Sequence, residues 1–232
     1  MTHGLPQAAP NRSRLISLLS NLIAADIQIP HRQFAEKLAL FINLADSIRL
    51  ADGLYEVTKA KPEPCIDSPD AIRDAFLRER AGLVRIILKT KIDDAGGVDF
   101  KPLQKFYLLQ QSTMESKIPQ LRSRARKAVA ARSTRLAQLA ELDLALDSAL
   151  AAQSRVVFAA IPRLLHKRFI FLQQDAAAPW QESFCREMRT LLLAELEVRL
   201  QPVMGLIEAL EEEPTHETNT TDQNSQNKVD CI

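Results

Sequence analysis

A run of cations without acids is the sharpest local signal for chemistry in this sequence. Between Glu115 and Glu141 the chain carries seven basic residues and no acidic residue. Six of them fall in residues 122–135: Arg122, Arg124, Arg126, Lys127, Arg132 and Arg135. Closely spaced cations on a helix gain affinity for phosphates by releasing counterions. The segment is therefore a candidate anion or partner contact, and nucleic-acid binding is one hypothesis for it.

Two features of the neighbouring sequence favour a protein contact over nucleic acid. No aromatic residue lies between Leu108 and Val157, so the stacking platforms that single-stranded nucleic acid uses are missing. Glu141, Asp143 and Asp147 follow the basic run, and in an antiparallel pair or a dimer such acids can lie against the arginines of a neighbouring helix. We expect structural or protein-partner use of the segment, with nucleic-acid binding as the alternative.

A second basic cluster follows Pro162 and is interleaved with aromatic side chains. It consists of Arg163, His166, Lys167 and Arg168, next to Phe169 and Phe171. Basic and aromatic residues in alternation are typical of an anion site or a membrane-surface site. The interpretation we prefer is that the apolar residues pack in a core while the cations extend into water.

Signatures of catalysis and of metal binding are missing from the sequence. Gly96-Gly97 lacks the Gly-Lys-Ser/Thr of a phosphate loop, and no serine occupies a nucleophile elbow. Cys65, Cys185 and Cys231 are widely spaced and form no CxxC pair, which predicts reduced thiols in the cytoplasm. We expect no enzymatic activity, no metal and no cofactor.

Net charge and hydropathy restrict the class of partner. A formal net charge of +1 argues against a surface built as a whole for nucleic acid or for an anionic membrane, and leaves local patches open. The uncharged stretch from Leu15 to Ala25 is far shorter than the ~20 residues of a spanning helix. We therefore expect no transmembrane segment and a protein partner or self-association.

Composition and periodicity predict an all-α fold of long amphipathic helices, arranged as an elongated bundle or a coiled-coil-like antiparallel hairpin. Only six of 232 residues are glycine, and good helix formers dominate. Residues 121–172 contain no glycine and carry leucines at spacings of three and four, which predicts one long helical rod. Pro119 and Pro162 should kink continuing helices, and Arg132 is the cation that falls in the apolar sector.

Prolines and polar stretches predict the organisation of the chain. We expect a flexible arm (1–10), an N-terminal helical pair (11–58), a Pro-rich linker (59–69), a long-helix bundle or coiled-coil region (70–212) and a disordered polar tail (213–232). Ser68-Pro69 is a strong helix start. Gly82 lies inside the helix that follows, where a close helix crossing would justify it, and Pro202 and Gly205 should loosen the end of the last helix.

The helical pair at the N-terminus is predicted from two apolar rows. A short helix is expected over Asn11–Ala25. A longer one should begin after Pro30 and end near Gly53 or soon after it, because its apolar residues step by four and three: Phe34, Leu38, Phe41, Ala45 and Ile48.

Several motifs resemble a proteobacterial family, the domain-of-unknown-function family thirty-three forty-eight. They are Phe34-Ala35-Glu36-Lys37-Leu38 with Ala45-Asp46-Ser47-Ile48, the Arg-rich run from Met114 to Ser133, and Leu193-Ala194-Glu195-Leu196-Glu197-Val198-Arg199-Leu200-Gln201-Pro202-Val203. The sequence departs from the family pattern at Phe41 and Leu44, where tryptophans are expected. These motifs are packing signatures and assign no catalytic residue.

The resemblance implies a bacterial cytoplasmic helical protein whose genes often neighbour those of envelope proteins similar to the OmpA and MotA/TolQ groups. Such a protein would be an accessory to a membrane-anchored assembly. Together with the motif analysis, this favours a non-enzymatic helical scaffold or adaptor that acts through protein–protein contacts. The alternative is a nucleic-acid-binding protein that uses residues 122–135.

Overall fold

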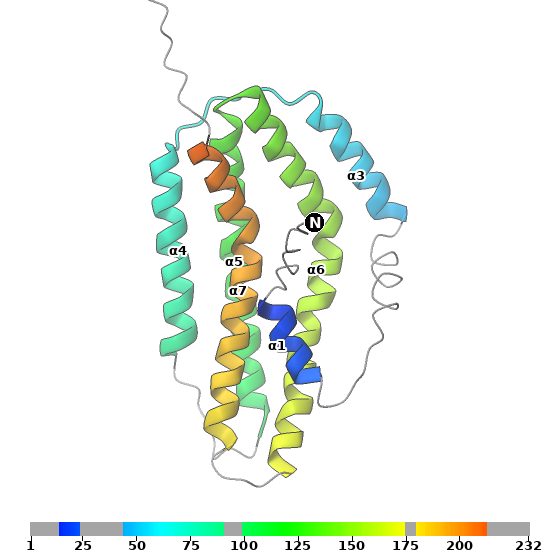
Figure 1. The fold of residues 1–232 in the computed structure, drawn as a ribbon, viewed down its shortest axis with the longest axis vertical. Coiled ribbons are helices and arrows are strands. Elements are labelled where there is room, and N and C mark those ends of the chain that lie inside the picture. Colours follow the sequence, from blue (N-terminus) through cyan, green and yellow to red (C-terminus); the bar gives the residue numbers. More distant parts are fainter. Residues whose placement is uncertain (1–13, 24–43, 91–98, 175–179, 213–232) are drawn as a thin grey trace, which may run out of the picture.

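The structure, a computed structural model, describes residues 14–23, 44–90, 99–174 and 180–212. These residues form helices and no strands (Figure 1), so the all-α fold class is confirmed. The helices are α1 (Arg14–Ile23), α3 (Leu44–Val57), α4 (Pro69–Lys89), α5 (Lys101–Ala130), α6 (Thr134–Gln174) and α7 (Trp180–Glu212).

Four of the helices, α4 to α7, run side by side and reverse direction from one to the next (Figure 1). Helix α5 packs against α4, α6 and α7, and α7 also packs against α4 and α6. This is the arrangement of an up-and-down helical bundle. Its fully buried side chains come from all four helices and include Ile72, Tyr107, Leu165, Phe184 and Met188.

The helix starts follow from local capping. The Ser68 hydroxyl accepts a hydrogen bond from the Ala71 N–H at 3.2 Å, and Pro69 occupies the first turn of α4, as the sequence predicted. At the start of α5 the Asp99 carboxylate accepts from the Lys101 N–H at 3.0 Å.

The prediction of one rod over residues 121–172 is wrong, because the chain turns back between α5 and α6. Helix α5 ends at Ala130 and α6 begins at Thr134. The Ser133 hydroxyl accepts from the Leu136 N–H at 3.2 Å and caps the new helix. Arg132 lies in this turn and is exposed, so its place in an apolar sector, which assumed a continuous helix, is also wrong.

Helices α5, α6 and α7 each contain one proline beyond the first turn, and each helix continues through it. Helix α5 continues through Pro119 and α6 through Pro162, which confirms that neither proline starts a new helix. Helix α7 continues through Pro202 to Glu212, so the expected loosening near Gly205 is wrong. Burial holds these last turns in place: Val203, Leu206, Ile207 and Leu210 all lie in the core.

The described parts of the N-terminal region pack against the bundle. Helix α1 contacts α6 and α7, and α3 lies along α6 at the edge of the bundle (Figure 1). Phe34, Leu38 and Phe41 of the predicted second helix lie outside the described residues, as do the arm 1–10 and the tail 213–232. The division of the chain at residues 59–69 stays a prediction.

Glycines at two positions have opposite surroundings. A Cβ on Gly53 of α3 would collide with the Cβ of Ala145 on α6, so Gly53 permits the close approach of these helices. A Cβ on Gly82 of α4 would meet no atom within 4 Å. No close helix crossing therefore justifies Gly82, and the close approach that needs a glycine is at Gly53.

Alanine substitutions at the two glycines should change stability in opposite directions. We expect Gly82→Ala to raise the free energy of unfolding by about 0.5–1 kcal/mol, because alanine favours helix and meets no clash. Gly53→Ala should lower it by about 1–3 kcal/mol through overpacking and speed amide hydrogen exchange in α3. Urea unfolding and hydrogen exchange measure both effects. A Gly53→Ala protein as stable as the parent would contradict the close contact.

Candidate functional site

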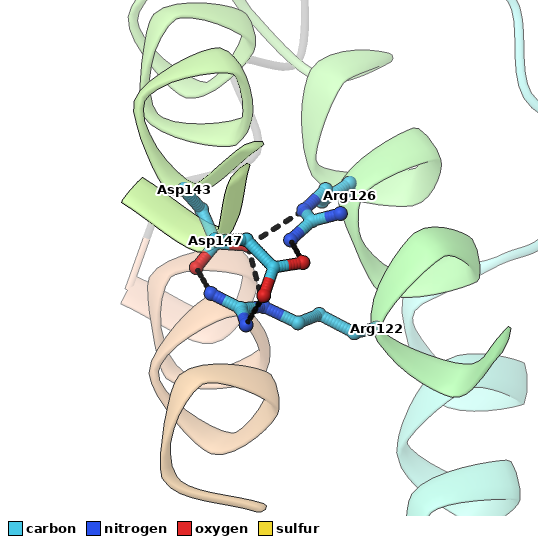
Figure 2. Close-up of polar contacts among 4 residues, drawn as sticks. All are labelled: Arg122, Arg126, Asp143 and Asp147. Carbon is cyan, nitrogen blue, oxygen red and sulfur yellow. Dashed lines mark hydrogen bonds and ion pairs between the residues drawn. The ribbon is translucent and has the colours of Figure 1, made fainter. Parts of the chain in front are cut away.

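Two arginines of the predicted basic segment and two of the aspartates that follow it form a closed ionic cluster between α5 and α6 (Figure 2). Arg122 donates from Nε and Nη2 to Asp143, at 2.9 and 2.6 Å, and from Nη1 to Asp147 at 2.6 Å. Arg126 donates to the same carboxylates, at 2.6 Å to Asp143 and 2.7 Å to Asp147. Each carboxylate thus bridges both guanidinium groups. We call these four residues the ionic quartet.

The ionic quartet is largely shielded from water. The side chains of Arg122, Arg126 and Asp143 are each 14% exposed, and that of Asp147 is 40% exposed. Burial opposes the ionisation of Asp143, but hydrogen bonds from Arg122 and Arg126 outweigh it and lower the pKa of this carboxyl below its ordinary value of 3.8. Its contribution to stability is therefore present above pH 3.8 and is lost as the pH falls through the lowered pKa.

The other four cations of the basic segment are more exposed. Arg124 forms a bidentate pair with Asp67 at 3.2 Å, half exposed to water. Lys127, Arg132 and Arg135 are exposed, and within the part of the chain that the structure describes no ion pair is recorded for them. The structure thus divides the six predicted residues into three with internal partners and three that face solvent.

The second predicted cluster, Arg163 to Arg168, is divided in the same way. Arg168 pairs with Glu187 of α7 at 3.1 and 3.2 Å, and the ring of His166 stacks on Phe100 at 4.8 Å. Arg163 and Lys167 are exposed on α6. Two members of the cluster therefore hold helices together, and two extend from the bundle.

A buried polar cluster in the bundle core was missed by the sequence analysis. Glu195 of α7 is fully buried and accepts hydrogen bonds from three side chains: Tyr107 Oη at 2.8 Å, Gln111 Nε2 at 3.0 and 3.1 Å, and Arg199 Nε at 2.9 Å. Burial and the neighbouring carboxylate raise the pKa of Tyr107 well above its ordinary value. The available signal was a carboxylate at helical spacing among leucines, between Leu192 and Leu196.

The same cluster repairs the backbone defect that Pro162 creates in α6. Proline has no N–H, so the carbonyl four residues earlier, that of Phe158, loses its helical donor. Gln111 Nε2 of α5 donates to this carbonyl at 3.0 Å. The guanidinium of Arg199 also lies over the Phe158 ring, 3.9 Å from its centroid. One glutamine thus joins α5, α6 and α7.

The geometry of both clusters suits holding the helices in place rather than reacting with a substrate. The Glu195 carboxylate is surrounded by donors and has no exposed surface, so it offers no atom to a substrate. In the described ranges, no three His, Cys, Asp or Glu side chains come together as a metal site requires. What the arrangement does is fix the register of α5 against α6 and α7.

The fold and the two clusters together define the class: an up-and-down helical bundle in which buried charges pair with one another, Glu195 within α7 and the ionic quartet between α5 and α6. The family model for a protein of unknown function, DUF3348, matches residues 1–212. The chain belongs to this family, which confirms the resemblance seen in its motifs. No curated protein and no solved structure matches the chain significantly.

Removing the glutamine should be less harmful when the proline is also removed. We expect Gln111→Leu to lower the free energy of unfolding by about 2–3 kcal/mol, because it leaves the Phe158 carbonyl and part of Glu195 without donors. In a Pro162→Ala background the new N–H can reach the Phe158 carbonyl, so the loss should shrink by about 1 kcal/mol. Denaturant unfolding of the four proteins measures this coupling.

Pro119→Ala is the matched control, because Pro119 frees the carbonyl of Glu115, which does not accept from Gln111. Equal losses in the Pro162→Ala and Pro119→Ala backgrounds would contradict the proposed repair.

Proposed function

We propose that this protein is a non-enzymatic helical scaffold or adaptor that acts through protein–protein contacts. The observation that carries the proposal is the outer row of α3. Ile48, Ala51 and Tyr55 follow one another at spacings of three and four and are all exposed, Ile48 at 54% and Tyr55 at 63%. Apolar anchors at such spacing are how amphipathic helices enter grooves of partner proteins.

Internal pairing of the arginines supports the same proposal. Two of the six candidate cations, Arg122 and Arg126, are neutralised by Asp143 and Asp147, and Arg124 pairs with Asp67. A phosphate backbone would have to compete with these carboxylates. The affinity gained from counterion release falls with each cation withdrawn from the phosphates.

Nucleic-acid binding through residues 122–135 is the second candidate. It is favoured by the exposure of Lys127, Arg132 and Arg135 near the turn between α5 and α6. The test is retention of duplex DNA at low salt by the parent and by the Lys127→Glu, Arg132→Glu, Arg135→Glu variant. Salt-sensitive binding that this variant loses would support the candidate, and no binding by the parent would exclude it.

The family resemblance adds a setting to the proposal. We place the protein in the bacterial cytoplasm as an accessory to a cell-envelope assembly, with a second protein or a second copy of this chain as its partner. No catalytic group, metal or cofactor enters this proposal.

A photocrosslinking amino acid at position 51 should test the α3 contact directly. We expect a crosslinked product, to a second copy or to another protein, that Ile48→Glu/Tyr55→Glu abolishes, because the charges prevent burial of the anchors. Gel electrophoresis of the crosslinked cells, with light scattering of the purified protein for self-association, measures the outcome.

The matched control is Leu77→Glu/Leu88→Glu on α4, where both leucines are about half exposed, 51% and 48%. Crosslinks from position 51 that survive Ile48→Glu/Tyr55→Glu, or that the α4 variant removes equally, would count against α3 as the contact.

A further inference from the structure

The second half of α6 presents an exposed face in which cations and large apolar side chains alternate. We define the α6 outer face as Val156, Arg163, Lys167, Ile170 and Phe171. We propose that this face docks on the surface of an anionic phospholipid bilayer. The inference uses a different helix from the α3 contact and does not rest on the proposed scaffold function.

Position along the helix places these residues on one side of α6. Val156, Arg163, Lys167 and Ile170 are separated by seven, four and three residues, the spacing of one helix face. The apolar members are open to solvent, with Val156 61%, Ile170 42% and Phe171 49% exposed. The core side of the same helix is occupied by Ile161, Leu165 and Phe169, which are buried.

Charge gives the face its selectivity for an anionic partner. Helix α6 carries no acidic residue after Asp147, whereas Arg155, Arg163 and Lys167 are exposed. Within the described part of the chain no ion pair is recorded for these three cations. Basic residues beside exposed apolar side chains are the composition of interfacial helices, in which the apolar groups enter the boundary of the acyl chains and the cations attract anionic headgroups.

Docking on the surface explains the hydropathy of α6 better than spanning does. Among the described helices, α6 is the one that is long enough and apolar enough to cross a bilayer. Only 22% of its apolar 18-residue stretch is buried inside the bundle. The bundle nevertheless uses the core side of α6, and Arg168 ties the helix to Glu187 of α7. Spanning would break these contacts, whereas surface binding uses only the side chains that the bundle leaves exposed.

Vesicle binding by the full chain tests the proposal. We expect the protein to sediment with vesicles of phosphatidylglycerol and phosphatidylethanolamine, to release at high salt, and to remain free with phosphatidylcholine alone. Arg163→Glu/Lys167→Glu should weaken binding by about thirtyfold or more, since each cation near an anionic surface contributes ~1 kcal/mol. Val156→Ser/Phe171→Ser should also weaken it, because both side chains lie in the apolar part of the face.

Arg78→Glu/Arg85→Glu on α4, where both arginines are exposed, makes the same change in net charge and should leave vesicle binding intact. Circular dichroism of every variant establishes that the bundle is folded. Three results would each overturn the proposal: no binding by the parent protein, equal binding to neutral vesicles, or equal loss in the α4 variant. Displacement by inorganic phosphate, with no effect of Val156→Ser/Phe171→Ser, would instead identify a soluble anion as the ligand and also overturn it.

Discussion

The ionic quartet between α5 and α6 is the interaction on which the arrangement of the bundle depends. Its arginines are four residues apart on α5 and its aspartates four apart on α6. The two pairs therefore meet in a single register once the helices run antiparallel. Removing one member would leave the other three with an unbalanced, partly buried charge, which is unfavourable. The quartet thus selects one alignment of the hairpin, and α7 then packs on α5 and α6.

The core adds a second constraint of the same kind. Glu195 is buried at the level where α6 lacks a backbone donor, and Gln111 serves both the carboxylate and the Phe158 carbonyl. Buried polar groups that are fully hydrogen-bonded disfavour other alignments, because a shift of one residue would leave donors and acceptors without partners. Pro162 and the polar core are therefore matched: Pro162 leaves the Phe158 carbonyl without its helical donor, and Gln111 of α5 donates to that carbonyl instead.

Periodicity predicted much of the fold, and its failures have local causes. Ser68-Pro69 and the helices through Pro119 and Pro162 were predictable, since caps and apolar spacing are local. The turn at Ala131–Ser133 was missed because no glycine marks it, although Ser133 is a good helix cap. For the candidate site, two of the three acids named from the sequence, Asp143 and Asp147, pair with the arginines, whereas Glu141 is not part of the ionic quartet. The contacts of Glu195 with Tyr107 and Gln111 were not predictable, since these two partners lie 88 and 84 residues away in the sequence.

The ionisable groups of the α5–α6 hairpin hold the bundle together, and we propose that exposed residues of α3 and α6 make the outside contacts. Arg122 and Arg126 are the partners of Asp143 and Asp147, and exchanging the charges tests this pairing. The free energy of unfolding should fall when both arginines become aspartate or both aspartates become arginine. It should recover most of that loss when all four are exchanged, because the ion pairs are restored in the reverse sense. If the losses in the two double variants simply add up in the fourfold variant, the pairing of these four residues would be contradicted.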